Sequence, residues 1–209
     1  ENIIKHKFDA RDMLNLIAQT QLQSGYPYLM FKDNANKNHA LREIGQVKMS
    51  NLCTEIFQLQ ETSVIKDYGE GDIIKRDISC NLASLNIVNV MESKKLKESI
   101  YSGMDALTFV SDSTKIKNAP GVVKANEEFH SVGLGAMNLN GYLAKNLIAY
   151  DSEEAKDFAN VFFMMMNYYT IERSMQIAKE RKETFKDFEK SDYYNGAYFT
   201  KYITNDYLP

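Results

Sequence analysis

The fold class of this chain rests on one stretch, Asp77-Ile-Ser-Cys-Asn-Leu-Ala-Ser-Leu-Asn-Ile-Val-Asn-Val-Met91. Its apolar residues are dense enough to predict that most of it is a buried strand. A second stretch, Val132-Gly-Leu-Gly-Ala-Met137, is small and apolar, which is typical of a strand packed closely against a neighbour. A helical pattern lies between the two. Strands separated by helices predict a helix-rich α/β fold.

Helical periodicity is strongest over residues 152–182, where apolar side chains recur every three or four positions. Asp151 is the expected N-cap, because Glu154 follows three residues later in a near capping-box pattern. Shorter helices are predicted at 9–24, where Gly25 would end the helix, at 96–117 and at 139–146, with a helical turn at 122–130.

Extended segments are expected in the first third of the chain. Tyr26–Phe31 is short and aromatic, which favours a strand. Residues 47–59 are predicted to form a strand, a turn that carries Cys53, and a second strand. The polar stretch 32–46 is expected to be a loop that can include a helical turn, and 60–75 a surface excursion.

The composition is that of a globular protein. The 209 residues are 44% hydrophobic and 25% charged, so one domain with a real core is expected. No apolar run approaches the ~20 residues of a membrane helix. No signal-peptide pattern follows the first residues, and we expect a cytoplasmic protein. The net charge of −3 argues against binding to a nucleic-acid duplex.

The cysteines and histidines do not predict a metal site. Cys53 and Cys80 are the two cysteines and form no CxxC pair, so they cannot complete a four-thiolate zinc site. Without a secretory signal, both thiols are expected to be reduced. His6, His39 and His130 are scattered along the chain.

The chemically densest segment is Ser50-Asn-Leu-Cys-Thr-Glu55. In an extended backbone, alternate side chains share a face, so Asn51, Cys53 and Glu55 would converge. A carboxylate beside a thiol disfavours the thiolate, and no histidine lies nearby in sequence to activate one. Hydrogen-atom transfer at a neutral thiol fits the trio better, with the carboxylate as a base on a substrate hydroxyl. The alternative is a buried strand cysteine beside a solvent-facing glutamate.

Cys80 lies in the strand predicted within the stretch 77–91. Two extended segments joined by a loop of this size can lie side by side, which would bring Cys80 near Cys53. The alternative is a plain core cysteine, because cysteine is among the most often buried residues.

These motifs resemble the catalytic core of the large subunit of class I ribonucleotide reductase, most closely that of class Ib. The resemblance is carried by Asn51-Leu-Cys-Thr-Glu55 and Asp77-Ile-Ser-Cys-Asn-Leu-Ala-Ser-Leu-Asn-Ile87. It covers essentially the whole chain. The further matching motifs are Ser24-Gly-Tyr-Pro-Tyr-Leu-Met-Phe31, Val132-Gly-Leu-Gly-Ala-Met-Asn-Leu139 with Gly141-Tyr-Leu143, and Tyr198-Phe-Thr-Lys-Tyr202.

The resemblance implies a role for each of four residues. Cys53 becomes a transient thiyl radical that abstracts the 3′-hydrogen of the substrate ribose. Glu55 binds and deprotonates the 3′-hydroxyl, and Asn51 hydrogen-bonds in the same ribose pocket. Cys80 is one of two thiols that deliver reducing equivalents and end as a disulfide.

The resemblance also implies a fold and partners. The fold is a ten-stranded α/β barrel, in which residues 1–209 form a single segment without a second domain. A central finger loop near 47–59 carries the radical cysteine at its tip. No metal or other cofactor is expected on this chain. The implied partners are a ribonucleoside diphosphate, a metal-containing small subunit that supplies the radical, and a glutaredoxin-like or thioredoxin-like reductant.

Several parts of the family's large subunit have no counterpart here. They are the second thiol that pairs with Cys80, the tyrosine pair that passes the radical on, the substrate-phosphate loop, the effector-binding region and the C-terminal shuttle cysteines. We therefore expect a central piece that needs the other segments for activity. Two alternatives stay open: a non-catalytic, helix-rich remnant that acts as a binding or assembly module, and a simple thiol oxidoreductase built on Cys53 and Cys80.

Overall fold

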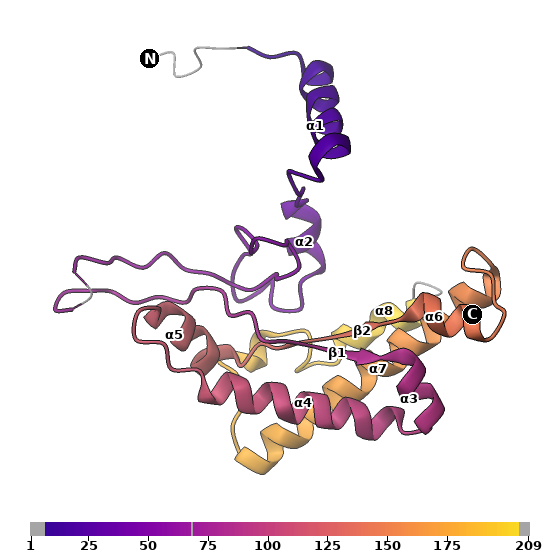
Figure 1. Cartoon of the computed structure of the whole chain (residues 1–209). Helices are drawn as coiled ribbons and strands as arrows, with labels where there is room; N and C mark the ends of the chain where they lie inside the picture. Colours follow the sequence, from indigo (N-terminus) through magenta and orange to yellow (C-terminus); the bar gives the residue numbers. More distant parts are fainter. Residues whose placement is uncertain (1–6, 68, 205–209) are drawn as a thin grey trace.

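The computed structural model describes residues 7–67 and 69–204, so His6 lies outside the described residues. Two strands lie beside a layer of long helices, and the N-terminal helix stands apart (Figure 1). The elements in chain order are α1 (Ala10–Ser24), α2 (Lys32–Asn38), β1 (Leu82–Asn86), α3 (Ile87–Ser93), α4 (Leu96–Ser113), α5 (Pro120–Phe129), β2 (Gly133–Met137), α6 (Leu139–Lys145), α7 (Glu153–Arg181), the 3₁₀ turn η1 (Phe188–Lys190) and α8 (Ala197–Thr204).

The sheet confirms the α/β prediction. β1 and β2 pair in parallel, with Leu82 opposite Gly133 and Asn86 opposite Met137. A parallel pair needs a crossover connection, and α3, α4 and α5 provide it. The strand predicted within 77–91 is shorter than expected. Asn86 Oδ1 accepts a hydrogen bond from Asn89 N at 3.3 Å and so caps α3.

The strands predicted at 26–31 and within 47–59 are wrong. Neither segment has a backbone ladder among the residues that the structure describes, and a strand needs a partner to satisfy its N–H and C=O groups. The predicted loop 32–46 contains more helix than the single turn expected, because α2 occupies its first half. The excursion 60–75 is confirmed as surface, with one antiparallel bridge between Val64 and Ile73.

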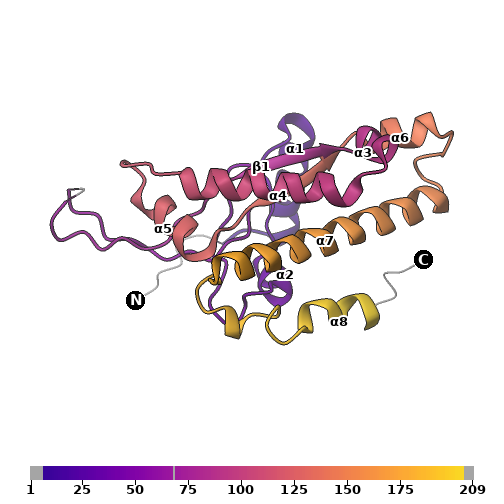
Figure 2. The ribbon, with the colours of Figure 1, turned by 90° about the horizontal axis from the view of Figure 1, so that it is seen from below.

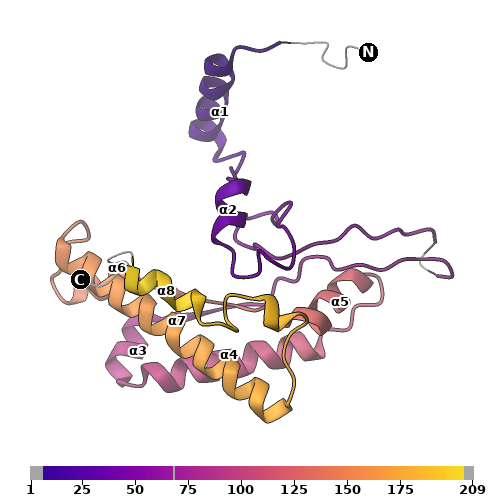
Figure 3. The same cartoon turned by 180° about the vertical axis from the view of Figure 1, so that it is seen from behind.

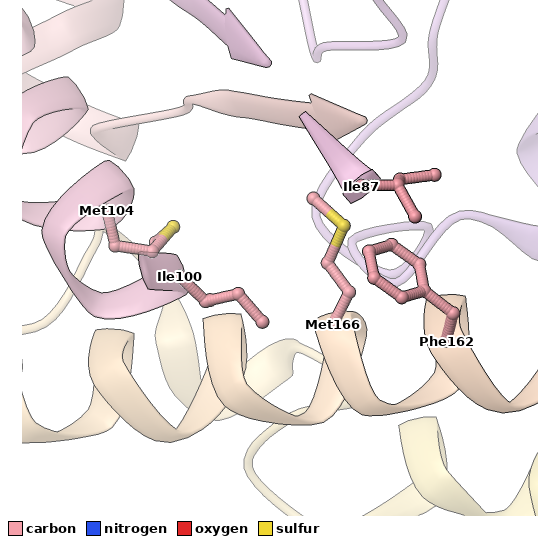
Figure 4. Close-up of a cluster of buried hydrophobic side chains, with 5 residues drawn as sticks. All are labelled: Ile87, Ile100, Met104, Phe162 and Met166. Carbon is pink, nitrogen blue, oxygen red and sulfur yellow. The ribbon is translucent and has the colours of Figure 1, made fainter. Parts of the chain in front are cut away.

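A small core joins the strands to the two longest helices. Ile87 begins α3, Ile100 and Met104 belong to α4, and Phe162 and Met166 belong to α7. Their side chains point toward one another (Figure 4). Burying a side chain of this kind stabilises by about 1.5–3 kcal/mol. The core therefore fixes the end of β1 against the helical layer.

Helix α7 follows the predicted periodicity, but its N-cap was predicted one residue too early. Ser152 caps the helix, because its side chain accepts from Ala155 N at 3.2 Å. The prediction for α1 is confirmed at its end, because Gly25 stops the helix with a left-handed backbone, φ 77°. The helix begins at Ala10, and Asp9, predicted as its first residue, is the N-cap. Only the local hydrogen bonds decide which of two neighbouring polar residues becomes the cap.

Helices α4 and α7 pack side by side over much of their length (Figure 2). Charged pairs tie their exposed edges together. Arg173 Nε lies 2.7 Å from Asp105 Oδ1, and Arg181 Nη2 lies 2.5 Å from Asp112 Oδ2. These pairs fix the register of the two helices.

The C-terminal segment returns along α7, with α8 beside it (Figure 3). Tyr198 Oη donates to Asn167 Oδ1 at 3.1 Å, and Asn167 Nδ2 donates to Tyr202 Oη. One asparagine of α7 therefore holds two tyrosines of α8.

Helix α1 projects away from the rest of the chain (Figure 1). It has no buried residue, and Leu22 is 89% exposed. Other apolar side chains on or near it are also exposed: Phe8, Met13, Leu14 and Leu16. Among the described residues, no helix combines the length and apolar character needed to cross a bilayer.

Candidate functional site

Cys53 lies in a tight turn. Thr54 N donates to the carbonyl of Asn51 at 3.0 Å, and Thr54 has a left-handed backbone, φ 63°. The alternation of an extended strand therefore does not apply here. The predicted turn is confirmed, whereas the extended geometry that was expected to align the three side chains is wrong.

The turn nevertheless brings Asn51 and Glu55 together. Asn51 Nδ2 donates to Glu55 Oε1 at 2.8 Å. Asn51 Oδ1 accepts from Ile56 N at 3.0 Å and from Ser50 Oγ at 3.2 Å. Because the amide oxygen is used by these donors, only the NH₂ group can face the carboxylate. Glu55 is exposed and can be reached by a ligand.

The finger loop is defined as residues 47–59; its first limb precedes the Cys53 turn and its second limb follows it. Side chains outside the turn hold the first limb. Asn36 of α2 makes two bonds to Val47: Nδ2 donates to the carbonyl at 2.9 Å, and Oδ1 accepts from the N–H at 2.8 Å. Val47 is fully buried, at 0% exposure. The asparagine thus takes the place of a neighbouring strand.

The second limb is held in the same way. His39 Nε2 lies 2.7 Å from the carbonyl of Phe57, and His39 Nδ1 accepts from Leu41 N at 3.1 Å. The N–H of Leu41 can only donate, so the proton of a neutral His39 belongs on Nε2. Gln60, the residue after the loop, donates from Nε2 to the carbonyl of Met49 at 2.8 Å and so joins the end of the loop to its first limb.

Cys80 lies beside the finger loop and close to Glu55. Its Sγ is 3.9 Å from Glu55 Oε1. Its neighbours Ser79 and Asn81 are buried, whereas Cys80 is exposed, as alternation along an extended segment requires. Partial desolvation by the surrounding atoms first, and then the Glu55 carboxylate and the Cys53 thiol, raise the pKa of the Cys80 thiol above its ordinary value.

Both cysteines are free and exposed. The expectation that 77–91 lies beside 47–59 is confirmed, because Glu55 contacts Cys80. The alternative of a core cysteine is wrong for both thiols.

Two tyrosines also belong to this region. Tyr26 first, and then burial, Cys53 and Glu55, raise the pKa of Tyr28.

A buried arginine anchors the segment that leads to Cys80. Arg76 is 7% exposed, and its guanidinium lies 2.9 Å from both Glu61 and Glu128. The guanidinium carbon is also 4.6 Å from the centre of the Phe129 ring, which is cation–π geometry. Arg76 therefore ties the end of the excursion to α5.

An open cavity of about 1430 Å³ extends from the finger loop along α7. Glu55 lines it together with Asn81, Ser84 and Asn167. Its lining mixes apolar surface with a few polar groups, as ligand sites usually do. Within 7–67 and 69–204, no three His, Cys, Asp or Glu side chains are grouped to hold a metal ion.

Sequence reasoning found the thiols, the amide and the carboxylate but missed the residues that hold them. Asn36, Gln58 and Arg76 were not singled out. Their partners lie far away in sequence or on backbone atoms, so no spacing pattern marks them. The one available signal is a high number of asparagine and glutamine residues near the finger loop, since their side chains can bond to a backbone that has no partner strand.

The fold contains a parallel βαβ unit, and a turn places a thiol, an amide and a carboxylate near a second thiol. The chain is therefore part of an α/β protein. Residues 1–207 match the family described as ribonucleotide reductase, barrel domain. The chain belongs to this family.

Named relatives agree with this assignment. The chain is 54% identical over 205 residues to the ribonucleoside-diphosphate reductase subunit alpha of Bacillus subtilis, covering 98% of this chain and 29% of that protein. It is 42% identical over 203 residues to the subunit alpha of Mycoplasma genitalium, covering 97% and 28%. The chain thus spans less than a third of these relatives.

A solved structure shows the same fold. The class Id ribonucleotide reductase alpha subunit of Actinobacillus ureae matches with a TM-score of 0.70 and 25% identity, covering 90% of this chain and 34% of that one. The expectation of part of an α/β barrel is confirmed. The finer assignment to class Ib, the single-domain assignment of 1–209 and the roles of the four site residues stay predictions.

Proposed function

We propose that this chain supplies the radical-bearing and substrate-activating residues of a ribonucleoside-diphosphate reductase. The reaction is the conversion of ribonucleoside diphosphates to deoxyribonucleoside diphosphates for DNA synthesis. One observation carries the proposal: Glu55 is held by Asn51 at 2.8 Å and lies 3.9 Å from the Cys80 thiol. Family membership and the names of the relatives support the same activity.

Cys53 acts as the hydrogen-atom acceptor. As a thiyl radical, its sulfur takes the hydrogen atom from C3′ of the ribose, which leaves a carbon radical and a Cys53 thiol. The sulfur is exposed at the turn and can approach a ribose. The other segments of the subunit would exclude water from the bound substrate.

Glu55 acts as the base on the 3′-hydroxyl. Its carboxylate accepts the hydroxyl proton, and the Asn51 NH₂ group keeps it oriented. A positioned general base contributes roughly 10²- to 10⁴-fold to a rate.

Cys80 acts as one of two reducing thiols. Replacing the 2′-hydroxyl with hydrogen releases water and consumes two electrons and two protons. Cys80 and a second thiol from outside this chain supply both and become a disulfide. Partial desolvation and the Glu55 carboxylate raise the pKa of Cys80, which keeps its proton in place until it is needed. Return of the hydrogen atom from Cys53 to C3′ regenerates the thiyl radical.

The partners follow from this chemistry. A metal-containing small subunit delivers the radical, and no cofactor is held by this chain. A glutaredoxin-like or thioredoxin-like protein reduces the disulfide after each turnover. The remaining segments of the large subunit complete the barrel, and the protein works in the cytoplasm without nucleic-acid or membrane contacts.

The variant Glu55→Gln tests the role of the base. The amide keeps an oxygen for Asn51 Nδ2 but cannot accept the hydroxyl proton, so reduction of a ribonucleoside diphosphate should fall by at least about 100-fold. Glu70→Gln, an exposed position in the excursion, is the matched control and should retain full activity. The assay combines the chain with the other alpha-subunit segments, the small subunit and a dithiol. Equal activity of both variants would refute the proposal.

A further inference from the structure

Gln58 links the finger loop to the segment that carries Cys80. Its side chain makes two bonds to the backbone of Ser79: Nε2 donates to the carbonyl at 2.6 Å, and Oε1 accepts from the N–H at 2.9 Å. This pairing copies one rung of a β-ladder, with an amide side chain in place of a strand. Ser79 precedes Cys80, and Gln58 lies three residues after Glu55.

The Ser79 end of this link is fixed from the other side. Ser79 Oγ donates to Asn126 Oδ1 of α5 at 2.5 Å. Asn81 Nδ2 donates to the same oxygen at 3.1 Å and to Ser79 Oγ at 2.9 Å. Ser79, Asn81 and Asn126 are 2%, 9% and 2% exposed. Both neighbours of Cys80 are therefore immobilised against α5.

The Asn81 backbone is held as well, because Gly133 N donates to its carbonyl at 2.8 Å. Cys80 consequently sits on a segment tied to α5 and β2. The finger loop reaches that segment through Gln58, and Cys80 Sγ meets Glu55 Oε1 at 3.9 Å. The Gln58 amide therefore directly links the loop that carries the carboxylate to the segment that carries the thiol.

We infer that Gln58 is a positioning residue that sets the distance of the Cys80 thiol from Glu55 and Cys53. The inference rests on the proposed function, because the distance matters only if the Cys80 thiol and the Glu55 base act on the same ribose. It assigns Gln58 no contact with substrate. A displacement of about 1 Å at reacting groups can lower a rate by roughly 100-fold.

The titratable groups that act on Cys80 are Glu55 and Cys53, both from the finger loop. Loss of the Gln58 link lets the loop move away from Cys80. Burial and the two neighbouring groups then act less strongly on the thiol, and its pKa falls toward the ordinary value. The pH at which Cys80 reacts with an alkylating reagent therefore reports the separation.

The test measures alkylation by iodoacetamide from pH 6 to 10 in the full chain, followed by mass spectrometry of the two cysteine peptides. Gln58→Leu removes both bonds to Ser79, and Gln58→Asn keeps an amide on a shorter arm. Both should move the Cys80 profile to lower pH and raise its rate at pH 8 by at least about threefold. Gln19→Leu, an exposed glutamine of α1, is the matched control and should change nothing.

Far-ultraviolet circular dichroism of each variant is the reference for folding, and the helical signal should stay unchanged. An unchanged Cys80 profile in Gln58→Leu overturns the inference. A loss of helical signal that accompanies the shift also overturns it, because Gln58 would then support the fold and not one distance. Alkylation needs no turnover, so this result is independent of whether the chain proves to be part of a reductase.

Discussion

Arg76 offers the sharpest test of how the Cys80 segment is anchored. We predict that Arg76→Met destabilises the chain by about 2 kcal/mol. Removing one partner of a buried ion pair costs about 3–5 kcal/mol. The lower end of this range, about 3 kcal/mol, applies, because both carboxylates still have a cationic neighbour in the variant: Lys186 lies 3.0 Å from Glu128, and Lys75 lies 3.6 Å from Glu61.

Among the described residues, Arg76 Nε has no hydrogen-bond acceptor. Removing this unsatisfied buried donor stabilises the variant by about 1 kcal/mol, which leaves the net loss of about 2 kcal/mol.

The assay is urea unfolding at low protein concentration, followed by tyrosine fluorescence, because the chain has 13 tyrosines and no tryptophan. With a slope of about 2 kcal/mol per M urea, the midpoint should fall by about 1 M. Arg42→Met is the matched control. Arg42 pairs with Asp192, and its side chain is 39% exposed, so the loss should stay below about 1 kcal/mol. A loss at Arg76 no larger than at Arg42 would refute the anchoring argument.

Three further outcomes are expected. Gly121→Ala should destabilise the chain in urea more than Gly133→Ala does. A Cβ at 121 meets the fixed backbone carbonyl of Lys75 at 3.0 Å, whereas a Cβ at 133 meets the end of the exposed Leu82 side chain, which can move aside. The reverse order would contradict the packing. Burial raises the pKa of Glu128, but bonds from Lys186 and Arg76 outweigh it and lower the pKa overall. Its stabilising effect is therefore complete above the ordinary carboxyl pKa and is lost as the pH falls through the lowered value. Melting temperatures should drop below about pH 4.5, and less so in Glu128→Gln; identical acid profiles would count against this. The chain on its own should elute early from a sizing column, because α1 leaves apolar side chains exposed; a sharp monomer peak would contradict this.

The helices could be predicted from the sequence because their signals are local. The periodicity of α7 and the Gly25 stop of α1 lie within a few residues of the structure they define. The segments at 26–31 and 47–59 could not be predicted in this way. Strand residues alone do not make a strand, since the ladder depends on a partner elsewhere in the protein.

The site divides in the same way. The motif Asn51-Leu-Cys-Thr-Glu55 marks the groups proposed to react, and the Asn51–Glu55 contact follows from a turn of five residues. The link to the Cys80 segment is made by Gln58, whose partner Ser79 lies far along the chain. No local pattern encodes such a contact, because a glutamine side chain can bond to any backbone within reach.

The central claim is that Cys53 is the hydrogen-atom acceptor. The most direct measurement is ribonucleoside diphosphate reduction by Cys53→Ser, with the chain assembled with the other alpha-subunit segments, the small subunit and a dithiol. A serine hydroxyl cannot form the sulfur radical, and Cys53 is exposed, so we predict complete loss of deoxynucleotide formation with an unchanged urea midpoint. Deoxynucleotide formation at the unsubstituted rate would contradict the account.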